Sequence, residues 1–186
     1  PKLDTAVILW PCQKGHLEVL EPILHELADT GLTTILLSQR NTVNLSRIPA
    51  KQKVEVEYKR TLKLRRSRWE IIGRKLVKLS KSIEFNGSVS YEKQVFSNLL
   101  EYAFGTWMPL YEQTLEICDR IYKNFNPSFI LVGNEYTFVG RMAVFYFQER
   151  GIPTGCSMHG TISPKLPTER FVADCHYLFG KSIQKE

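Results

Sequence analysis

The hydrophobic pattern twice repeats one order of segments along the chain. Residues 5–10 (TAVILW) are apolar in succession, residues 11–31 carry apolar positions at helical spacing and end in glycine, and residues 32–38 (LTTILLS) are apolar again. The same order returns in residues 127–133 (PSFILVG), 134–151 and 152–158 (IPTGCSM). Each set predicts a strand, a helix and a second strand.

Strands that are apolar at successive positions are typical of parallel sheets covered on both faces by helices. Two more strands are expected, at residues 53–58 (KVEVEY) and near residues 175–180 (CHYLFG). Strands that alternate with helices through right-handed crossovers predict an α/β fold, a three-layer, doubly wound, Rossmann-like parallel sheet. We expect a single domain over residues 1–186, with a basic helical insertion at about residues 60–125.

Three helices are expected in the insertion, and a long loop is expected before it at residues 38–50. In the first helix, Ile72, Leu76, Leu79 and Ile83 follow Trp69 on an apolar face, and Arg74, Lys75, Lys78 and Lys81 fall on the opposite face. The second helix is expected at about residues 91–104, ending at Gly105, with Thr106 as the N-cap of the third. In the third, a buried stripe is expected at Trp107, Tyr111, Leu115, Cys118, Tyr122 and Phe125.

Composition limits the class of protein. The 186 residues are 43% hydrophobic, which fits a globular domain with a core, and no apolar run reaches the length of a membrane span. We therefore expect a cytoplasmic protein. The four cysteines lack the spacing of a zinc site or a disulfide framework, so reduced thiols and no metal are expected. Residues 51–81 hold twelve of the 25 lysines and arginines, which favours an anionic partner surface.

Ligands of doubly wound sheets bind beyond the carboxyl ends of the strands, which directs attention to the loops at residues 11–17, 133–137 and 157–164. In the first loop (CQKGHLE), Gly15 lets the backbone approach a ligand, and the imidazole of His16 can accept a proton from a hydroxyl. A helix-capping role for His16 is the alternative. The glycine patterns of nicotinamide- and ATP-binding loops are absent, so no cofactor is expected in this domain.

The second loop (VGNEYT) presents Asn134, Glu135 and Tyr136 at the same sheet edge. Glu135 is expected to orient an imidazole, as a carboxylate does for a catalytic histidine, and Asn134 is expected to cap the following helix. Arg141, about two turns into that helix, is a candidate for binding an anion, although a solvent-facing ion pair is the more common role of such an arginine.

The third loop (SMHGTISPK) contains His159, Gly160 and Thr161. Glycine relaxes the backbone beside the histidine, and the threonine hydroxyl suits an oxygen-rich ligand. A structural histidine is the alternative at this position. His25 and His176, in a helix and a late strand, are expected to be structural.

At these loops the sequence resembles a known group. The pattern from residue 7 (VILWPCQKGHLEVLEPILHELADTGLTTILLS) through residues 127–160 (PSFILVGNEYTFVGRMAVFYFQERGIPTGCSMHG) is similar to the N-terminal, acceptor-side domain of GT-B glycosyltransferases of bacterial capsule and surface-polysaccharide type. In that family the histidine of a first-loop "GH" serves as catalytic base, which implies this role for His16. The "MHGT" loop is similar to the "HGT" loop of the polymer glycerophosphotransferases of teichoic acid synthesis, which implies a functional His159.

The resemblance implies a domain that binds a carbohydrate or glycolipid acceptor, with the nucleotide-sugar donor held by a second, C-terminal domain or subunit that this chain does not include. The family often places an aspartate after the fourth strand, where this chain has Asn134 and Glu135. The basic segment from Arg65 to Lys81 fits a peripheral contact with an anionic membrane, at its inner face, or an ordinary solvated helix face; no nucleic-acid partner is expected. Two alternatives are a non-catalytic docking subunit and a fragment of a sugar-nucleotide epimerase.

Overall fold

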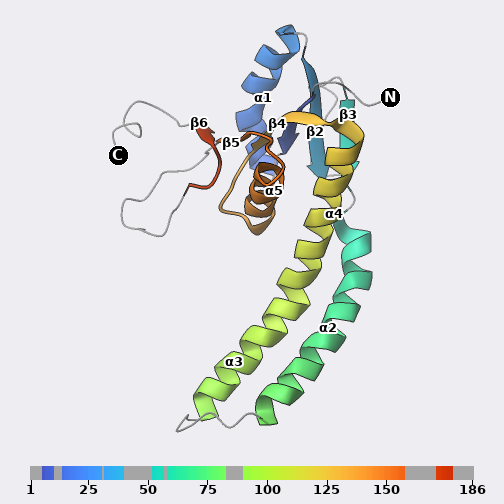
Figure 1. Ribbon diagram of the computed structural model, residues 1–186, viewed down its shortest axis with the longest axis vertical. Coiled ribbons are helices and arrows are strands. Elements are labelled where there is room, and N and C mark those ends of the chain that lie inside the picture. Colours follow the sequence, from blue (N-terminus) through green and yellow to red (C-terminus); the bar gives the residue numbers. More distant parts are fainter. Residues whose placement is uncertain are drawn as a thin grey trace. The chain divides into compact units, whose positions relative to one another are not determined.

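The computed structural model describes residues 6–10, 14–30, 32–39, 52–56, 58–82, 90–157 and 171–177. The chain forms two compact units (Figure 1). Unit 1 comprises Pro1–Val56 and Thr114–Glu186, and unit 2 comprises Glu57–Gln113. The helical middle of the chain is therefore compact in its own right, where the sequence predicted an insertion within a single domain.

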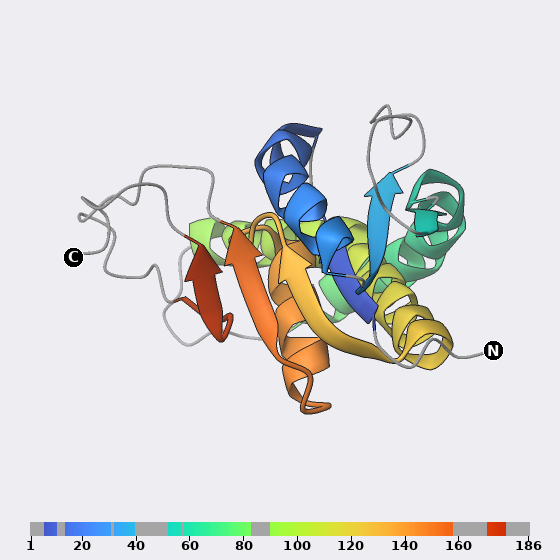
Figure 2. The same ribbon diagram turned by 90° about the horizontal axis from the view of Figure 1, so that it is seen from above.

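Unit 1 contains a six-stranded parallel sheet in the order β3-β2-β1-β4-β5-β6 (Figure 2). The strands are β1 (Ala6–Trp10), β2 (Thr33–Gln39), β3 (Gln52–Val56), β4 (Pro127–Val132), β5 (Thr154–Ser157) and β6 (Cys175–Tyr177). This is the strand order of the Rossmann fold, and the predicted α/β fold class is confirmed. The loop expected at residues 38–50 starts later, because β2 extends through Gln39, and its remainder lies outside the described residues.

Two helices cover opposite faces of this sheet. The connection from β1 to β2 through α1 (Lys14–Asp29) and the connection from β4 to β5 through α5 (Phe138–Gln148) run in opposite directions along the sheet. Because both crossovers are right-handed, they place their helices on opposite faces. Figure 2 shows this three-layer arrangement.

The core beneath α1 follows from helix spacing and strand register. Leu36 of β2 and Leu131 of β4 both pair with the same residue of β1, so they share a face of the sheet. Leu20 and Leu24, one helical turn apart in α1, pack on that face, and all four leucines are buried. Burying one such side chain stabilises the fold by about 1.5–3 kcal/mol.

On the other face, α4 (Met108–Phe125) corrects one prediction. The buried residues of its unit 1 portion are Thr114, Ile117, Cys118 and Ile121. Of the predicted stripe only Cys118 is fully buried, and Trp107, Tyr111 and Tyr122 are exposed. The prediction placed the large aromatic rings in the core. A tyrosine ring has a polar hydroxyl end that suits the surface. The Tyr122 ring lies 5.7 Å from the Arg150 guanidinium, a favourable contact of a cation with an aromatic ring.

The described cysteines are free thiols, as the sequence predicted for the chain. Cys118 and Cys156 are buried, Cys175 is half-buried, and Cys12 lies outside the described residues. Burial raises the pKa of the Cys118 thiol far above its usual range, so this side chain stays protonated and unreactive in the folded protein.

Unit 2 contains α2 (Tyr58–Ser82) and α3 (Ser90–Tyr102), which lie side by side and run in opposite directions (Figure 1). A π-helical turn, η2 (Ala103–Trp107), follows α3 directly, and Met108 N–H donates to the Ala103 carbonyl. The expected break at Gly105 and the expected N-cap at Thr106 are therefore wrong. Pro109 lacks the amide that an α-helix would donate to Gly105, and the wider π turn accommodates this without ending the helix.

The inward face of α2 matches the predicted face only in part. Gly73, Val77 and Ser80 are buried, with Trp69, Ile72 and Leu76 half-buried beside them. Leu79, expected on this face, is 61% exposed, because the buried positions step from Leu76 to Ser80 at the true helical period. The side chains of Lys81 and Ile83 lie outside the described residues.

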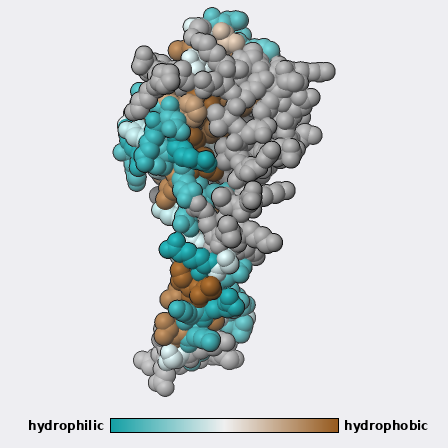
Figure 3. Space-filling view, turned by 90° about the vertical axis from the view of Figure 1, so that its right-hand side faces the viewer, coloured by the Kyte–Doolittle hydropathy of each residue, from teal (hydrophilic) through white to brown (hydrophobic). Residues whose placement is uncertain are grey.

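The outer surface of the hairpin formed by α2 and α3 mixes charges with apolar side chains. Arg74, Lys75 and Lys78 are exposed on α2, as predicted, and Ile71 and Leu79 are exposed on the same helix. Figure 3 shows hydrophobic side chains reaching the surface of this hairpin among hydrophilic ones. No helix within the described residues is both long enough and apolar enough to cross a membrane.

Candidate functional site

The loop of residues 133–137 begins where β1 and β4 lie side by side. Gly133 N–H donates to the carbonyl of Trp10 at 2.9 Å, so the loop leaves the sheet between the ends of these two strands. Strand order reverses at this point, since β1 connects toward β2 and β4 connects toward β5. Such a topological switch point is where open α/β sheets bind their ligands.

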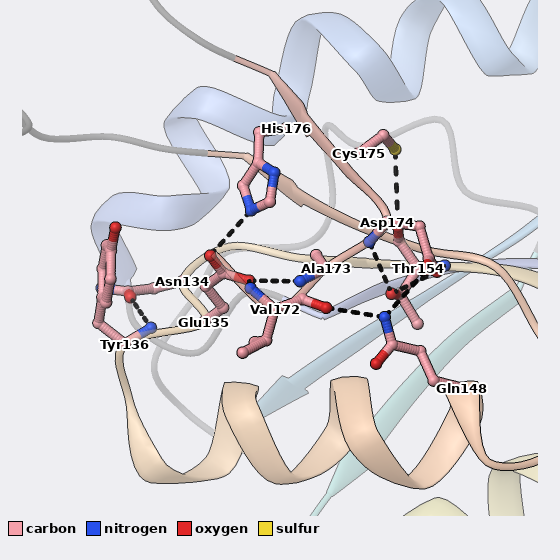
Figure 4. Close-up of polar contacts among 10 residues, drawn as sticks. All are labelled: Asn134, Glu135, Tyr136, Gln148, Thr154, Val172, Ala173, Asp174, Cys175 and His176. Carbon is pink, nitrogen blue, oxygen red and sulfur yellow. Dashed lines mark hydrogen bonds and ion pairs between the residues drawn. The ribbon is translucent and has the colours of Figure 1, made fainter. Parts of the chain in front are cut away.

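The loop folds through short polar contacts that the sequence only partly predicted. The side chain of Asn134 accepts from Tyr136 N–H at 2.8 Å, which forms a tight turn (Figure 4). Thr137, in extended conformation, accepts from Gly140 N–H at 3.1 Å through its hydroxyl and is the N-cap of α5. Asn134 was expected to be this cap and instead builds the turn that delivers Thr137 to that position.

Glu135 is the buried centre of the site. Its side chain is fully buried, and one carboxylate oxygen accepts from the backbone N–H groups of Val172 at 3.1 Å and Ala173 at 2.8 Å. The other oxygen lies 2.8 Å from Nε2 of His176 (Figure 4). Three short hydrogen bonds offset the cost of removing this carboxylate from water.

His176 lies in β6 at the same level of the sheet as the loop. Register pairs Trp10 with Val132, Val132 with Cys156, and Cys156 with His176, so the four residues form one row near the carboxyl edge. The imidazole is 14% exposed and packs against the Phe171 ring at 4.5 Å. Within the described residues, Nδ1 of His176 has no hydrogen-bond partner.

The Glu135–His176 pair can act in two ways. A carboxylate that accepts from Nε2 fixes the tautomer of a neutral imidazole and leaves Nδ1 as a proton acceptor. The same contact also ties β6 to the loop before α5. The sequence predicted a structural role for His176, and it predicted that Glu135 orients an imidazole without identifying which one. The missed signal was the predicted sixth strand, whose parallel placement beside β5 would have brought His176 to this edge.

Asp174 attaches the segment before β6 to β5 and to α5. Its carboxylate accepts from Thr154 N–H at 2.7 Å, from the Thr154 hydroxyl at 2.9 Å and from the Gln148 amide at 3.0 Å (Figure 4). Gln148 also donates to the Val172 carbonyl at 2.8 Å. Residues 172–176 are therefore bonded to the loop, to α5 and to β5.

This network makes stability depend on pH. The backbone amide of Thr154 and then its hydroxyl hold the pKa of Asp174 below its ordinary value of 3.8. A carboxyl whose pKa is lower in the folded state contributes stability above about pH 4, and the contribution is lost as pH falls through the folded value. We expect urea unfolding to show a loss of stability between pH 5 and pH 2.5 that is smaller in Asp174→Asn. Thr154→Val keeps the amide donor and should therefore show part of this pH-dependent loss of stability. Identical pH profiles for the wild type and both variants would contradict this role of Asp174.

The structure brings only some of the predicted site residues together. Asn134, Glu135 and Tyr136 share the edge, and Tyr136 is 39% exposed. Arg141 is half-buried in the first turn of α5, closer to the loop than the two turns expected, because the helix starts at Phe138.

The other predicted site residues lie partly or wholly outside the described residues. The backbones of Gly15 and His16 lie in the first turn of α1, and the side chain of His16 is outside the described residues. His159, Gly160 and Thr161 also lie outside the described residues. Within the described part of the chain, no cluster of three or more histidine, cysteine or acidic side chains is arranged to hold a metal ion.

Comparison with solved structures gives a distant likeness. No protein-family model matches the sequence, and no curated protein matches it. Among solved structures, the chain is similar to a UDP-GlcNAc 2-epimerase from Neisseria meningitidis bound to UDP-GlcNAc, with a TM-score of 0.43 and 15% sequence identity. The match covers 89% of this chain and 35% of the epimerase chain, so the present chain spans about a third of that enzyme's length. At this level the likeness says nothing about what the present chain binds.

Proposed function

We propose that the chain is the acceptor-binding domain of a glycosyltransferase of GT-B type. In this role it binds a surface polysaccharide or glycolipid, and a second domain or subunit supplies a nucleotide-activated sugar. His16 or His159 removes the proton from the attacking acceptor hydroxyl, or stabilises the departing phosphate. The proposed acceptor contacts are Gly15, Asn134, Tyr136, Arg141, Gly160 and Thr161.

The observation that supports this proposal best is the pairing of β1 with β4. The hydrogen bond from Gly133 N–H to the Trp10 carbonyl sets the start of the 133–137 loop beside the end of β1. The "KGHLE" stretch, with His16 in the first turn of α1, follows β1 after three residues. A base on one loop and polar groups on its neighbour are what deprotonation of a bound hydroxyl requires.

The Glu135–His176 pair adds a supporting role to this proposal. It holds the loop that carries Asn134 and Tyr136 against β6, so these two side chains approach a ligand from a fixed backbone. Glu135 then acts as a positioning residue, in place of the catalytic role first expected of it. A site held by buried contacts of this kind loses little entropy when its ligand binds.

The basic face of α2 fits a further part of the proposal. Arg74, Lys75 and Lys78 are exposed beside Leu79, and a helix surface of this kind suits peripheral contact with an anionic membrane that carries a glycolipid acceptor.

The test is sugar transfer by the complete gene product that contains this chain. It is incubated with a panel of UDP-, dTDP-, GDP- and CMP-sugars and with polysaccharide and glycolipid acceptors, and transfer is measured. We expect transfer by the complete protein and none by the 186-residue chain. His16→Ala or His159→Ala should lower kcat on the order of a hundredfold if the residue is the base.

The controls separate chemistry from stability. His25→Ala, at an exposed position of α1, should leave kcat unchanged. Unchanged rates with lowered stability in both His16 and His159 variants would assign these histidines structural roles. Turnover by the 186 residues alone, or release of an epimerised sugar nucleotide with no transfer, would contradict the proposed function.

A further inference from the structure

Unit 2 contains a pocket of about 460 Å³ beside the π turn. The described residues that line it include Glu70, Arg74, Glu101, Tyr102, Gly105 and Thr106. They come from α2, from the end of α3 and from η2 itself. π turns are frequent at functional sites because they displace side chains and carbonyls from the regular helical pattern.

Two glycines create this pocket. A Cβ atom at Gly73 would lie 2.8 Å from the Phe104 Cβ, so the absence of a side chain lets α2 approach the π turn. A Cβ atom at Gly105 would meet nothing within 4 Å, so this glycine leaves space open. The first glycine sets the contact between the helices, and the second leaves room beside it.

Polar groups at the rim are available to a ligand. Among the described residues, none bonds to the carboxylate of Glu101, to the hydroxyl of Tyr102 or to the hydroxyl of Thr106. The Tyr102 ring is 54% exposed and is supported edge-on by Trp107 at a centroid distance of 5.2 Å. An aromatic ring can pack against the C–H groups of a sugar, and the hydroxyl and carboxylate groups beside it can hydrogen-bond to the sugar's O–H groups.

The described residues that line the pocket carry charges of both signs. Glu70 and Glu101 contribute carboxylates, and Arg74 contributes a guanidinium. Carboxylates accept hydrogen bonds and a guanidinium donates them, so this lining offers both kinds of partner to the hydroxyl groups of a neutral sugar.

We infer that this pocket binds a saccharide unit through the hydroxyl groups and the C–H face of the sugar. Its assignment to the acceptor, as a second contact besides the sheet edge, rests on the proposed function. The binding itself does not, because the described residues that line the pocket all belong to unit 2 and none to the sheet edge.

The test is binding of the complete protein to an array of neutral, amine-bearing and anionic oligosaccharides. We expect retention of neutral glycans. Gly105→Phe, which fills the open space, should weaken binding at least tenfold, and Glu101→Ala, at an exposed position, should weaken it without affecting folding. Asn98→Ala, exposed on α3 and not among the described residues that line the pocket, is the control and should bind as the wild type does.

The outcomes separate this inference from the proposed function. Retention of no glycan, preference for anionic glycans, or binding unchanged by both Gly105→Phe and Glu101→Ala would overturn the pocket while leaving sugar transfer untouched. Glycan binding that these variants abolish, in a protein with no transferase activity, would support the pocket and overturn the transferase.

Discussion

Gly140→Ala is expected to destabilise the protein by about 3 kcal/mol, at the upper end for adding one methyl group to a packed site. A Cβ atom at Gly140 would overlap the carbonyl oxygen of Asn134 and lie 2.9 Å from the Thr137 hydroxyl. Both atoms belong to the turn that caps α5, in which the Thr137 hydroxyl donates to that same carbonyl at 2.9 Å. The backbone must therefore move, and the cap must open, before the alanine fits.

The measurement is the free energy of unfolding in urea, with hydrogen exchange of residues 134–148 as the local readout. Gly105→Ala is the matched control, because its added methyl meets nothing within 4 Å and it should be neutral or stabilising by about 0.5–1 kcal/mol. If Gly140→Ala were as stable as the wild type, with unchanged exchange, the tight loop geometry at the switch point would be wrong.

Glu135→Ala is expected to cost about 3–5 kcal/mol, the range for removing one partner of a buried ionic contact. The change leaves the N–H groups of Val172 and Ala173 and the imidazole of His176 without their acceptor. Glu135→Gln should cost less, about 1 kcal/mol. Its remaining oxygen still accepts from both N–H groups, and its amide can donate to a His176 whose Nε2 is unprotonated.

This prediction is checked by urea unfolding of both variants and of His176→Gln, followed by the double variant Glu135→Gln/His176→Gln. Glu149→Gln, an exposed glutamate at the end of α5, is the control and should be neutral. Additive losses in the double variant would show that the 2.8 Å contact contributes no coupling. Equal effects of Glu135→Ala and Glu149→Gln would contradict a buried carboxylate.

The sequence predicted the sheet well because its signal is local. Residues 129–132 are apolar at successive positions, and such a run is typical of a strand that is covered on both faces. Gly151, the glycine at the end of the helix predicted in residues 134–151, has a φ of 70°, the left-handed conformation that commonly follows a helix. These features depend on a few neighbouring residues, so the chain alone reveals them.

The features that the sequence did not predict depend on competition between nearby residues or on contacts between residues far apart in the chain. Asn134 and Thr137 are both good caps, and only the completed turn decides which one accepts from the helix. Gly105 favours a break, yet packing of Phe104 against Gly73 keeps the helix continuous. The partner of Glu135 was missed because His176 reaches it only through the pairing of β6 with β5, which joins residues far apart in the chain.

Because β6 is short, the side-chain contacts of residues 172–176 also help to hold this strand in the sheet. Three residues pair with β5, so few backbone hydrogen bonds hold this strand, and Glu135 and Asp174 supply much of its attachment. If the strand detached, the fully buried β5 would present open amide and carbonyl groups to other molecules. The buried carboxylate thus also protects against edge-to-edge aggregation, and loss of Glu135 should favour association between copies before the rest of the sheet unfolds.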